Sequence, residues 1–387
     1  MKGSKSMSEG VPLFEIYWDE NEVKNAIDSI TRGGYWANGP YVDQFEARLE
    51  RFFDREHAIA VNSGTTALIG ALKAHEIGPG DEVIVPSFTF IATGNAVRLA
   101  GGEPVFADIE LDTFGLDPDD VRRKITTDTV AILPVHCYGG ACKIDELAEL
   151  ASEHDLVLVE DAAEALGATR NGEKVGTFGD SAALSFCQNK VVTTGEGGAI
   201  LTDDERVARN LRLYRSHGRA SEDYFDDTTT GSYVTIGTNN RMSDVAASVG
   251  CAQMDKVQLL IEKRREVATR MNRAFESIRG VIPHGHGTSG RHVYQIYTVA
   301  LDDFINRATV VDTLSERNIA SKVYWDPPIH RTEYYRETHD QGNESLPVTD
   351  DISSRVLSLP LHPELTHEET DRIVTAVEES VSECRTR

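Results

Sequence analysis

The sequence has no apolar run of the roughly 18–20 residues that a membrane-spanning helix requires. Its N-terminal stretch, MKGSKSMSEG, also lacks the apolar segment of a secretory signal. Positive charge is scarce, because 39 Lys and Arg residues stand against 63 Asp and Glu residues, for a formal net charge of -24. We therefore expect a cytoplasmic protein that binds neither nucleic acid nor an anionic membrane through bulk electrostatics.

Lysine is the scarcer of the two basic residues, with 11 Lys against 28 Arg. An acidic, lysine-poor surface suits a cytosol of high ionic strength, where screening removes the self-repulsion of like charges. We take salt adaptation (a halophilic protein) as a hypothesis, and an ordinary acidic enzyme as its alternative.

The five cysteines do not have the pattern of a disulfide-bonded or zinc-binding protein. The number of cysteines is odd and no CxxC pair occurs among Cys137, Cys142, Cys187, Cys251 and Cys384. This pattern predicts neither a disulfide framework nor a zinc site, and we expect no metal in the protein. The cysteines are expected to be small buried hydrophobic residues in a reducing compartment.

The first two thirds of the chain alternate short apolar runs with helical patterns. Strands are expected at 83–85, 104–107, 130–135, 156–160 and 182–186, and helices at 67–74, 91–99 and 144–153. Continuous apolar strands separated by helices indicate a mostly parallel sheet that is covered on both faces. Ligands collect beyond the C-terminal ends of such strands.

The pattern changes after Met254. A long charged helix is expected over 256–278, followed by a Gly/His/Ser-rich loop at 284–292, a strand at 294–300, and helices near 303–318 and 367–384. We expect two domains: a large α/β domain that includes the N-terminal segment, residues 11–255, and a smaller α+β domain, residues 256–387.

Four features fall near strand ends of the large domain, and each has an ordinary alternative. The turn Asn62–Leu68 opens a helix whose N-terminus suits a phosphate, or it is a plain Ser/Thr cap. Asp161 follows a buried strand, where a carboxylate could face a cationic ring or cap a helix. Lys190 follows another strand and could form a Schiff base or be a solvated lysine. The segment Gly237–Met242 could be a loop preceding a helix.

The joint presence of these features indicates pyridoxal 5'-phosphate (PLP). Its aldehyde needs a lysine, its pyridinium needs a carboxylate, and its phosphate needs hydroxyl and backbone N–H groups. The glycines at 195–198 do not have the spacing of a dinucleotide-binding fingerprint, and no GxxxxGK[ST] loop occurs.

The ordered segments SGTTAL, GDEVIVPSFTFIATGNAV, PVHCYG, VEDAAEALGA, SFCQNK, TTGEGGA, GTNNRM and VYWDPPIH are similar to those of a known family. The chain resembles the DegT/DnrJ/EryC1/StrS sugar-nucleotide aminotransferases, of PLP fold type I (aspartate-aminotransferase-like), over residues 11–382. The resemblance implies an α/β fold, PLP as cofactor and a homodimer with shared active sites.

The resemblance also assigns roles. Lys190 matches the lysine that binds PLP and moves the proton, and Asp161 matches the partner of the pyridine nitrogen. Glu164 matches a residue near the ring hydroxyl, and Phe90 matches the aromatic that stacks on the ring. The implied phosphate ligands are Gly64, Thr65, Thr66, Ser185 and, toward the neighbouring subunit's cofactor, Asn239.

The implied reaction carries the amino group of L-glutamate to a nucleotide-linked keto-sugar in glycan biosynthesis. The run EDAAEALGA is most similar to perosamine-synthase-like members, which act at C4 of 4-keto-6-deoxyhexoses. Cys187-Gln188 departs from their pattern beside the lysine. The alternatives are a 3-keto sugar or keto-cyclitol substrate, or a non-catalytic regulatory protein. Arg241 and His330 are candidate substrate contacts, with a structural histidine as the alternative for His330.

Overall fold

The computed structural model describes residues 10–220, 231–285, 290–338 and 345–385. Seven strands form the main sheet in the order β1-β9-β8-β5-β4-β2-β3. Only β9 runs against its neighbours, because it pairs antiparallel with both β1 and β8 while the remaining pairs are parallel. The expected mostly parallel sheet is confirmed. The strands are β1 (His57–Val61), β2 (Glu82–Pro86), β3 (Glu103–Ala107), β4 (Thr129–Ile132), β5 (Val157–Asp161), β8 (Ser181–Ser185) and β9 (Gly198–Thr202).

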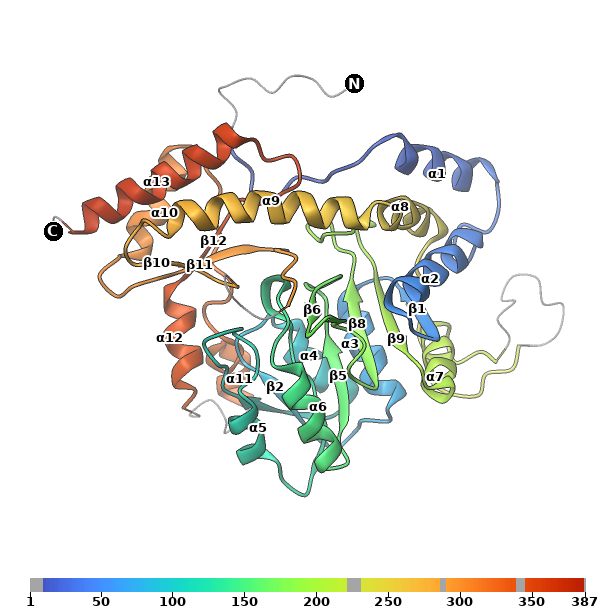
Figure 1. Cartoon of the computed structure of the whole chain (residues 1–387). Helices are drawn as coiled ribbons and strands as arrows, with labels where there is room; N and C mark the ends of the chain where they lie inside the picture. The colour runs from blue at the N-terminus through green and yellow to red at the C-terminus, as the bar shows by residue number, and fades with distance from the viewer. Residues whose placement is uncertain (1–9, 221–230, 286–289, 339–344, 386–387) are drawn as a thin grey trace.

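Helices cover both faces of this sheet (Figure 1). The alternation of side chains along a strand explains how: Ile59 and Val61 pack toward one set of helices, and Ala58 and Ala60 toward the other. The helices of this part are α1 (Glu20–Thr31), α2 (Pro40–Phe53), α3 (Gly64–Ala74), α4 (Ala92–Ala100), α5 (Pro118–Lys124), α6 (Ile144–Glu153), α7 (Glu205–Arg215) and α8 (Asp244–Met254). A short hairpin joins β6 (Thr169–Arg170) to β7 (Glu173–Lys174).

A second, antiparallel sheet has the order β10-β11-β12. Helix α9 leads to it from α8, and α13 lies alongside α9 (Figure 1). Val11 packs in the core of this second sheet, together with Ala268 and Val299. The elements in this part of the chain are α9 (Val257–Phe275), β10 (Val281–Pro283), β11 (Tyr297–Leu301), α10 (Arg307–Glu316), α11 (Glu333–Thr338), α12 (Pro347–Arg355), β12 (Val356–Leu359) and α13 (His367–Arg385), and Tyr335 of α11 packs against Phe106 of the main sheet.

The expected elements are found with small differences. The strand expected to run to residue 135 ends at Ile132, because beyond it the regular pairing gives way to an isolated bridge between Val135 and Asp161. The strand expected from residue 294 begins at Tyr297. Cys137, Cys142 and Cys251 are buried, while Cys187 and Cys384 are partly exposed. No helix of the described residues is both long and apolar enough to cross a membrane.

Candidate functional site

The last residues of β1 and β8 lie at the same end of the main sheet, the end at which its parallel strands terminate. Val61 and Ser185 both pair with Gly198, so the turn that follows β1 lies against the end of β8. Gly64 begins α3 there, and a Cβ on Gly64 would lie 2.7 Å from the Cβ of Ser185. Only glycine permits this close approach, which places the N-terminus of α3 beside a serine hydroxyl.

Hydrogen bonds fix the hydroxyl groups of the first turn of α3. The Ser63 hydroxyl accepts a hydrogen bond from the Thr66 N–H at 3.1 Å, and the Thr66 hydroxyl donates to Asn62 Oδ1 at 2.8 Å. Thr65 is partly exposed beside them. This turn can therefore be both a Ser/Thr helix cap and a phosphate-binding site. The cap orients backbone N–H groups that a phosphate can bind.

Asp161 is the last residue of β5 and is 5% exposed. Its Oδ2 accepts from the Thr93 hydroxyl at 2.9 Å and its Oδ1 from the Ala163 N–H at 3.2 Å. Burial raises the pKa of the Asp161 carboxyl, although these bonds and the charge of Lys190 lower it. Among the described residues no cation lies within 4 Å of this carboxylate, so it is suited to a cationic ligand.

The preceding residue, Glu160, points away from this site because successive strand residues alternate in direction. It accepts from His136 at 2.9 Å and from the backbone N–H groups of Gly176, Phe178 and Gly179. Burial alone would raise the pKa of Glu160, but these bonds hold it below its usual value. Glu160 thus anchors the loop after β7. Of the two neighbouring carboxylates, Asp161 is the one that faces the candidate site.

Lys190 and Glu164 form an ion pair at the same sheet edge, with Nζ 3.2 Å from Oε1. Both side chains are nearly buried, at 13% and 12% exposed. The other Glu164 oxygen accepts from the Tyr138 N–H at 3.0 Å. The lysine is therefore not a solvated surface residue, and its amine is held in one direction by a carboxylate.

Two further predicted residues, Phe90 and Asn239, are more exposed than Asp161 and Lys190. Phe90 is 58% exposed and follows Thr89, whose hydroxyl lies 3.1 Å from that of Thr93. Asn239 is exposed, and the next residue accepts the Asn62 N–H at 2.9 Å through its carbonyl. The segment that contains Asn239 thus flanks the α3 turn while its side chain faces outward.

His330 is completely buried: its Nδ1 lies 2.6 Å from the Ser87 hydroxyl and its Nε2 lies 3.3 Å from Asp350. Burial lowers the pKa of His330 to about 4, against the charge of Asp350. This geometry favours the structural alternative for His330 over a substrate contact.

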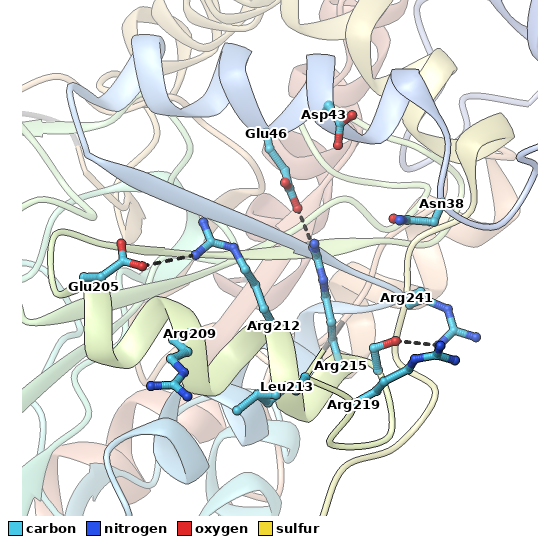
Figure 2. A pocket seen from close by; sticks show the side chains of 12 residues that line it. Asn38, Asp43, Glu46, Glu205, Arg209, Arg212, Leu213, Arg215, Arg219 and Arg241 are labelled. Carbon is cyan, nitrogen blue, oxygen red and sulfur yellow. Dashed lines mark hydrogen bonds and ion pairs between the residues drawn. The ribbon is translucent and has the colours of Figure 1, made fainter. Parts of the chain in front are cut away.

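Arg241 lies in a hollow of about 370 Å³ between α2 and α7 (Figure 2). Its Nη1 donates to the Ser216 hydroxyl at 3.0 Å. Arginine dominates the lining, and Glu46, which pairs with Arg215, is one of three carboxylates there. The arginines are Arg209, Arg212, Arg215, Arg219 and Arg241. In a chain of net charge -24, this is a local excess of positive charge.

Two residues that contact the predicted site residues could not be identified from the sequence. Thr93 and Tyr138 hold the oxygens of Asp161 and Glu164. Both lie within apolar-rich segments, and no spacing rule connects either residue to a carboxylate 68 or 26 positions away. Pairings of this kind depend on the sheet order, which places β5 between β8 and β4.

The described residues fit PLP. The phosphate would bind at the α3 N-terminus, which the close approach of Gly64 brings beside the Ser185 hydroxyl. The buried Asp161 carboxylate would balance a protonated ring nitrogen, and Lys190 offers the amine.

Comparison with known proteins supports PLP as the cofactor. Residues 18–378 match the DegT/DnrJ/EryC1/StrS aminotransferase family. A GDP-perosamine synthase of Caulobacter vibrioides is 36% identical, over 93% of this chain and 95% of that protein. Helicobacter pylori PseC, an aminotransferase of pseudoaminic acid biosynthesis, superposes with a TM-score of 0.91 at 26% identity over 97% and 100% of the two chains. A Streptococcus pneumoniae protein described as a sugar aminotransferase and solved in its PLP form has a TM-score of 0.89 at 27% identity over 97% and 99%.

Proposed function

The chain belongs to the DegT/DnrJ/EryC1/StrS aminotransferase family, whose members depend on PLP, and we propose that it transfers the amino group of L-glutamate to a nucleotide-linked keto-sugar. The 36% identity to a GDP-perosamine synthase supports C4 of a 4-keto-6-deoxyhexose as the acceptor. The observation that carries the proposal is the meeting of Lys190, Glu164 and Asp161 at neighbouring strand ends.

Each residue has a separate task. When bound, PLP supplies an aldehyde that an amine can capture and a ring that accepts electrons. The buried negative charge of Asp161 would keep the ring nitrogen of bound PLP protonated. Lys190 moves the proton between the two carbon atoms of the exchange, and Glu164 orients the lysine amine. Phe90 would stack on the ring, and Gly64, Thr65, Thr66 and Ser185 would hold the phosphate.

Arg241 is proposed to contact the diphosphate of the nucleotide, and His330 to remain structural. The arginine-lined hollow supports the first assignment, because guanidinium groups pair well with phosphate oxygens. We further propose that residues 11–255 and 256–387 form two domains, and that the protein is cytoplasmic and salt-adapted.

A homodimer with shared sites is the proposed assembly. Helix α1 exposes Val23, Ile27 and Ile30 on one face, at 44%, 54% and 48%, and Trp36 is 53% exposed nearby in the chain. An apolar surface of this kind is typical of an interface between subunits. Asn239 would reach the cofactor of the partner subunit.

The test of the substrate uses L-glutamate labelled with ¹⁵N and a panel of 4-keto-6-deoxyhexoses linked to GDP, TDP or UDP, with 3-keto isomers and a keto-cyclitol as competitors. NMR locates the transferred nitrogen. Nitrogen at C4 supports the proposal, and nitrogen at C3 or on the cyclitol supports the alternative acceptors. PLP binding without any turnover would support a regulatory protein instead.

The test of the shared site mixes two inactive variants. In a mixed dimer of Lys190→Ala and Asn239→Ala, one site combines an intact lysine with an intact asparagine. Random exchange of subunits should then restore about a quarter of wild-type activity, since half of the dimers are mixed and each has one intact site. Sites that are complete within one subunit would leave the mixture inactive.

A further inference from the structure

Residues 292–296, which lead into β11, run alongside the active-site loop that contains Tyr138. The Val293 N–H donates to the Gly139 carbonyl at 2.8 Å, and the Ile296 N–H donates to the Tyr138 carbonyl at 3.2 Å. A Cβ on Gly139 would lie 2.7 Å from the Gln295 nitrogen, so the two backbones are in close contact. Tyr138 is the residue whose N–H binds Glu164, so the 292–296 segment supports one half of the Lys190–Glu164 pair.

The same segment also reaches the lysine. The Gln295 side-chain amide donates to the Asn189 carbonyl at 2.7 Å, and Gln295 is 4% exposed. Asn189 directly precedes Lys190, whose own N–H donates to the Cys187 carbonyl at 2.9 Å. One short segment outside the main sheet therefore holds the backbone beside both members of the ion pair.

Two arginines on α9 fix the 292–296 segment in turn. Arg264 Nη1 donates to the carbonyls of Tyr294 and Gln295 at 3.2 and 3.3 Å, and Arg265 Nη1 donates to the His292 carbonyl at 2.8 Å. Arg264 is 3% exposed, and burial lowers its pKa to about 10, so it remains charged at neutral pH. Among the described residues it has no carboxylate partner within 4 Å, and its hydrogen bonds go to the backbone carbonyls of Tyr294, Gln295 and Leu361.

We propose that Gln295 is a positioning residue for Lys190, in an inference that rests on the proposed role of Lys190 as the PLP-binding lysine. A lysine amine sits on a flexible four-carbon stem, so its aim depends on how firmly its backbone is held. Gln295 fixes the Asn189 carbonyl, Arg264 fixes Gln295, and the amine is directed toward Glu164. Because Gln295 bonds a backbone carbonyl, the side chain at position 189 does not determine the contact.

The test measures how fast Lys190 captures PLP in protein freed of cofactor. The lysine amine adds to the aldehyde with loss of water, borohydride then reduces the new C=N bond, and peptide mass spectrometry identifies the modified lysine. Gln295→Met, of similar volume but with no amide donor, should slow capture at Lys190 by roughly 10- to 100-fold, the scale of a misplacement of about 1 Å. Unfolding temperature is measured in parallel.

Tyr297→Phe is the matched control. Tyr297 is also buried, in β11 just beyond the 292–296 segment, and its hydroxyl donates to Asn272 Oδ1 at 2.8 Å rather than to the backbone beside Lys190. This variant should lose stability and keep the wild-type rate of capture. A general effect of disturbing the second sheet would slow capture in both variants and would overturn the proposal.

Gln295→Glu gives a second readout that a purely structural role would not produce. Its carboxylate cannot donate to the Asn189 carbonyl at high pH, but the protonated acid can. The rate of capture relative to wild type at the same pH should therefore recover as the pH falls. A ratio that is flat with pH, or wild-type capture by Gln295→Met, overturns the positioning role alone. Failure of the wild-type protein to capture PLP at Lys190 overturns the proposed function together with it.

Discussion

The charge of Asp161 is the most informative single feature to remove. Asp161→Asn keeps the size of the side chain and an oxygen that can accept from the Thr93 hydroxyl or the Ala163 N–H. What it loses is a negative charge in a position that is 5% exposed. The neutral side chain can no longer stabilise a protonated ring nitrogen, and the ring becomes a poor electron acceptor.

The size of the effect follows from the surroundings of the carboxylate. Water is nearly excluded from Asp161, so its charge is screened less by solvent than a surface charge would be. Loss of one such preorganised electrostatic contact costs about 10²- to 10³-fold in kcat, or about 3–4 kcal/mol. KM for L-glutamate should change little, because the proposed partner of this carboxylate is the ring nitrogen and not the amino donor.

The pH dependence of folding stability independently checks whether the pKa of Asp161 is raised in the folded protein. Burial raises the pKa of Asp161, so the folded protein without cofactor binds this proton more tightly than the unfolded chain. Its stability therefore falls as pH rises above 3.8, the ordinary value, toward the raised pKa. Asp161→Asn should not show this loss, and without cofactor it should be at least as stable as wild type at pH 7.

The assay is the single-turnover rate with L-glutamate, followed at saturating PLP, together with thermal unfolding of the cofactor-free proteins. Asp145→Asn is the control, since Asp145 is partly exposed and pairs with Arg170 away from the site. Wild-type turnover in Asp161→Asn would refute the assignment of this residue. A cofactor-free variant that is much less stable than wild type would refute the account of its buried charge.

Four further outcomes are expected. Lys190→Ala should fold normally and show no covalent capture of PLP, by borohydride trapping and mass spectrometry; capture at another lysine with normal turnover would contradict this. Thr93→Val should weaken PLP binding about tenfold by loss of a bond to the Asp161 charge, while Thr93→Ser should not, as measured by fluorescence titration. Because His330 has a pKa of about 4 when folded against an ordinary 6.5, the folded state should lose up to about 3 kcal/mol as pH falls from 6.5 to 4, and His330→Asn should flatten this denaturation profile. If the protein is salt-adapted, its unfolding free energy should rise from low to molar KCl, and a flat dependence would contradict the hypothesis.

Much of the main sheet could be predicted from the sequence, because buried parallel strands leave continuous apolar runs such as LVLVE. The strand β9 was not predicted, since GAILT follows a glycine-rich turn and its pairing with both β1 and β8 is a matter of topology. The long helix was predicted three residues too far at its end, because its charged pattern continues beyond Phe275.

The site could be predicted only in part, for a similar reason. Asp161 and Lys190 were found because they end or follow apolar strands, which is a local signal. Thr93, Tyr138 and Gln295 carry no such signal, since their contacts join residues that are distant in the chain. The burial of His330 likewise comes from the packing of its turn against Ser87.

The most direct measurement is the visible absorption spectrum of the purified protein with PLP in high salt, before and after addition of L-glutamate. We predict a yellow band that depends on Lys190 and that bleaches when the donor amino group is transferred to the cofactor. A protein that stays colourless with added PLP, or a band that L-glutamate leaves unchanged, would contradict the account.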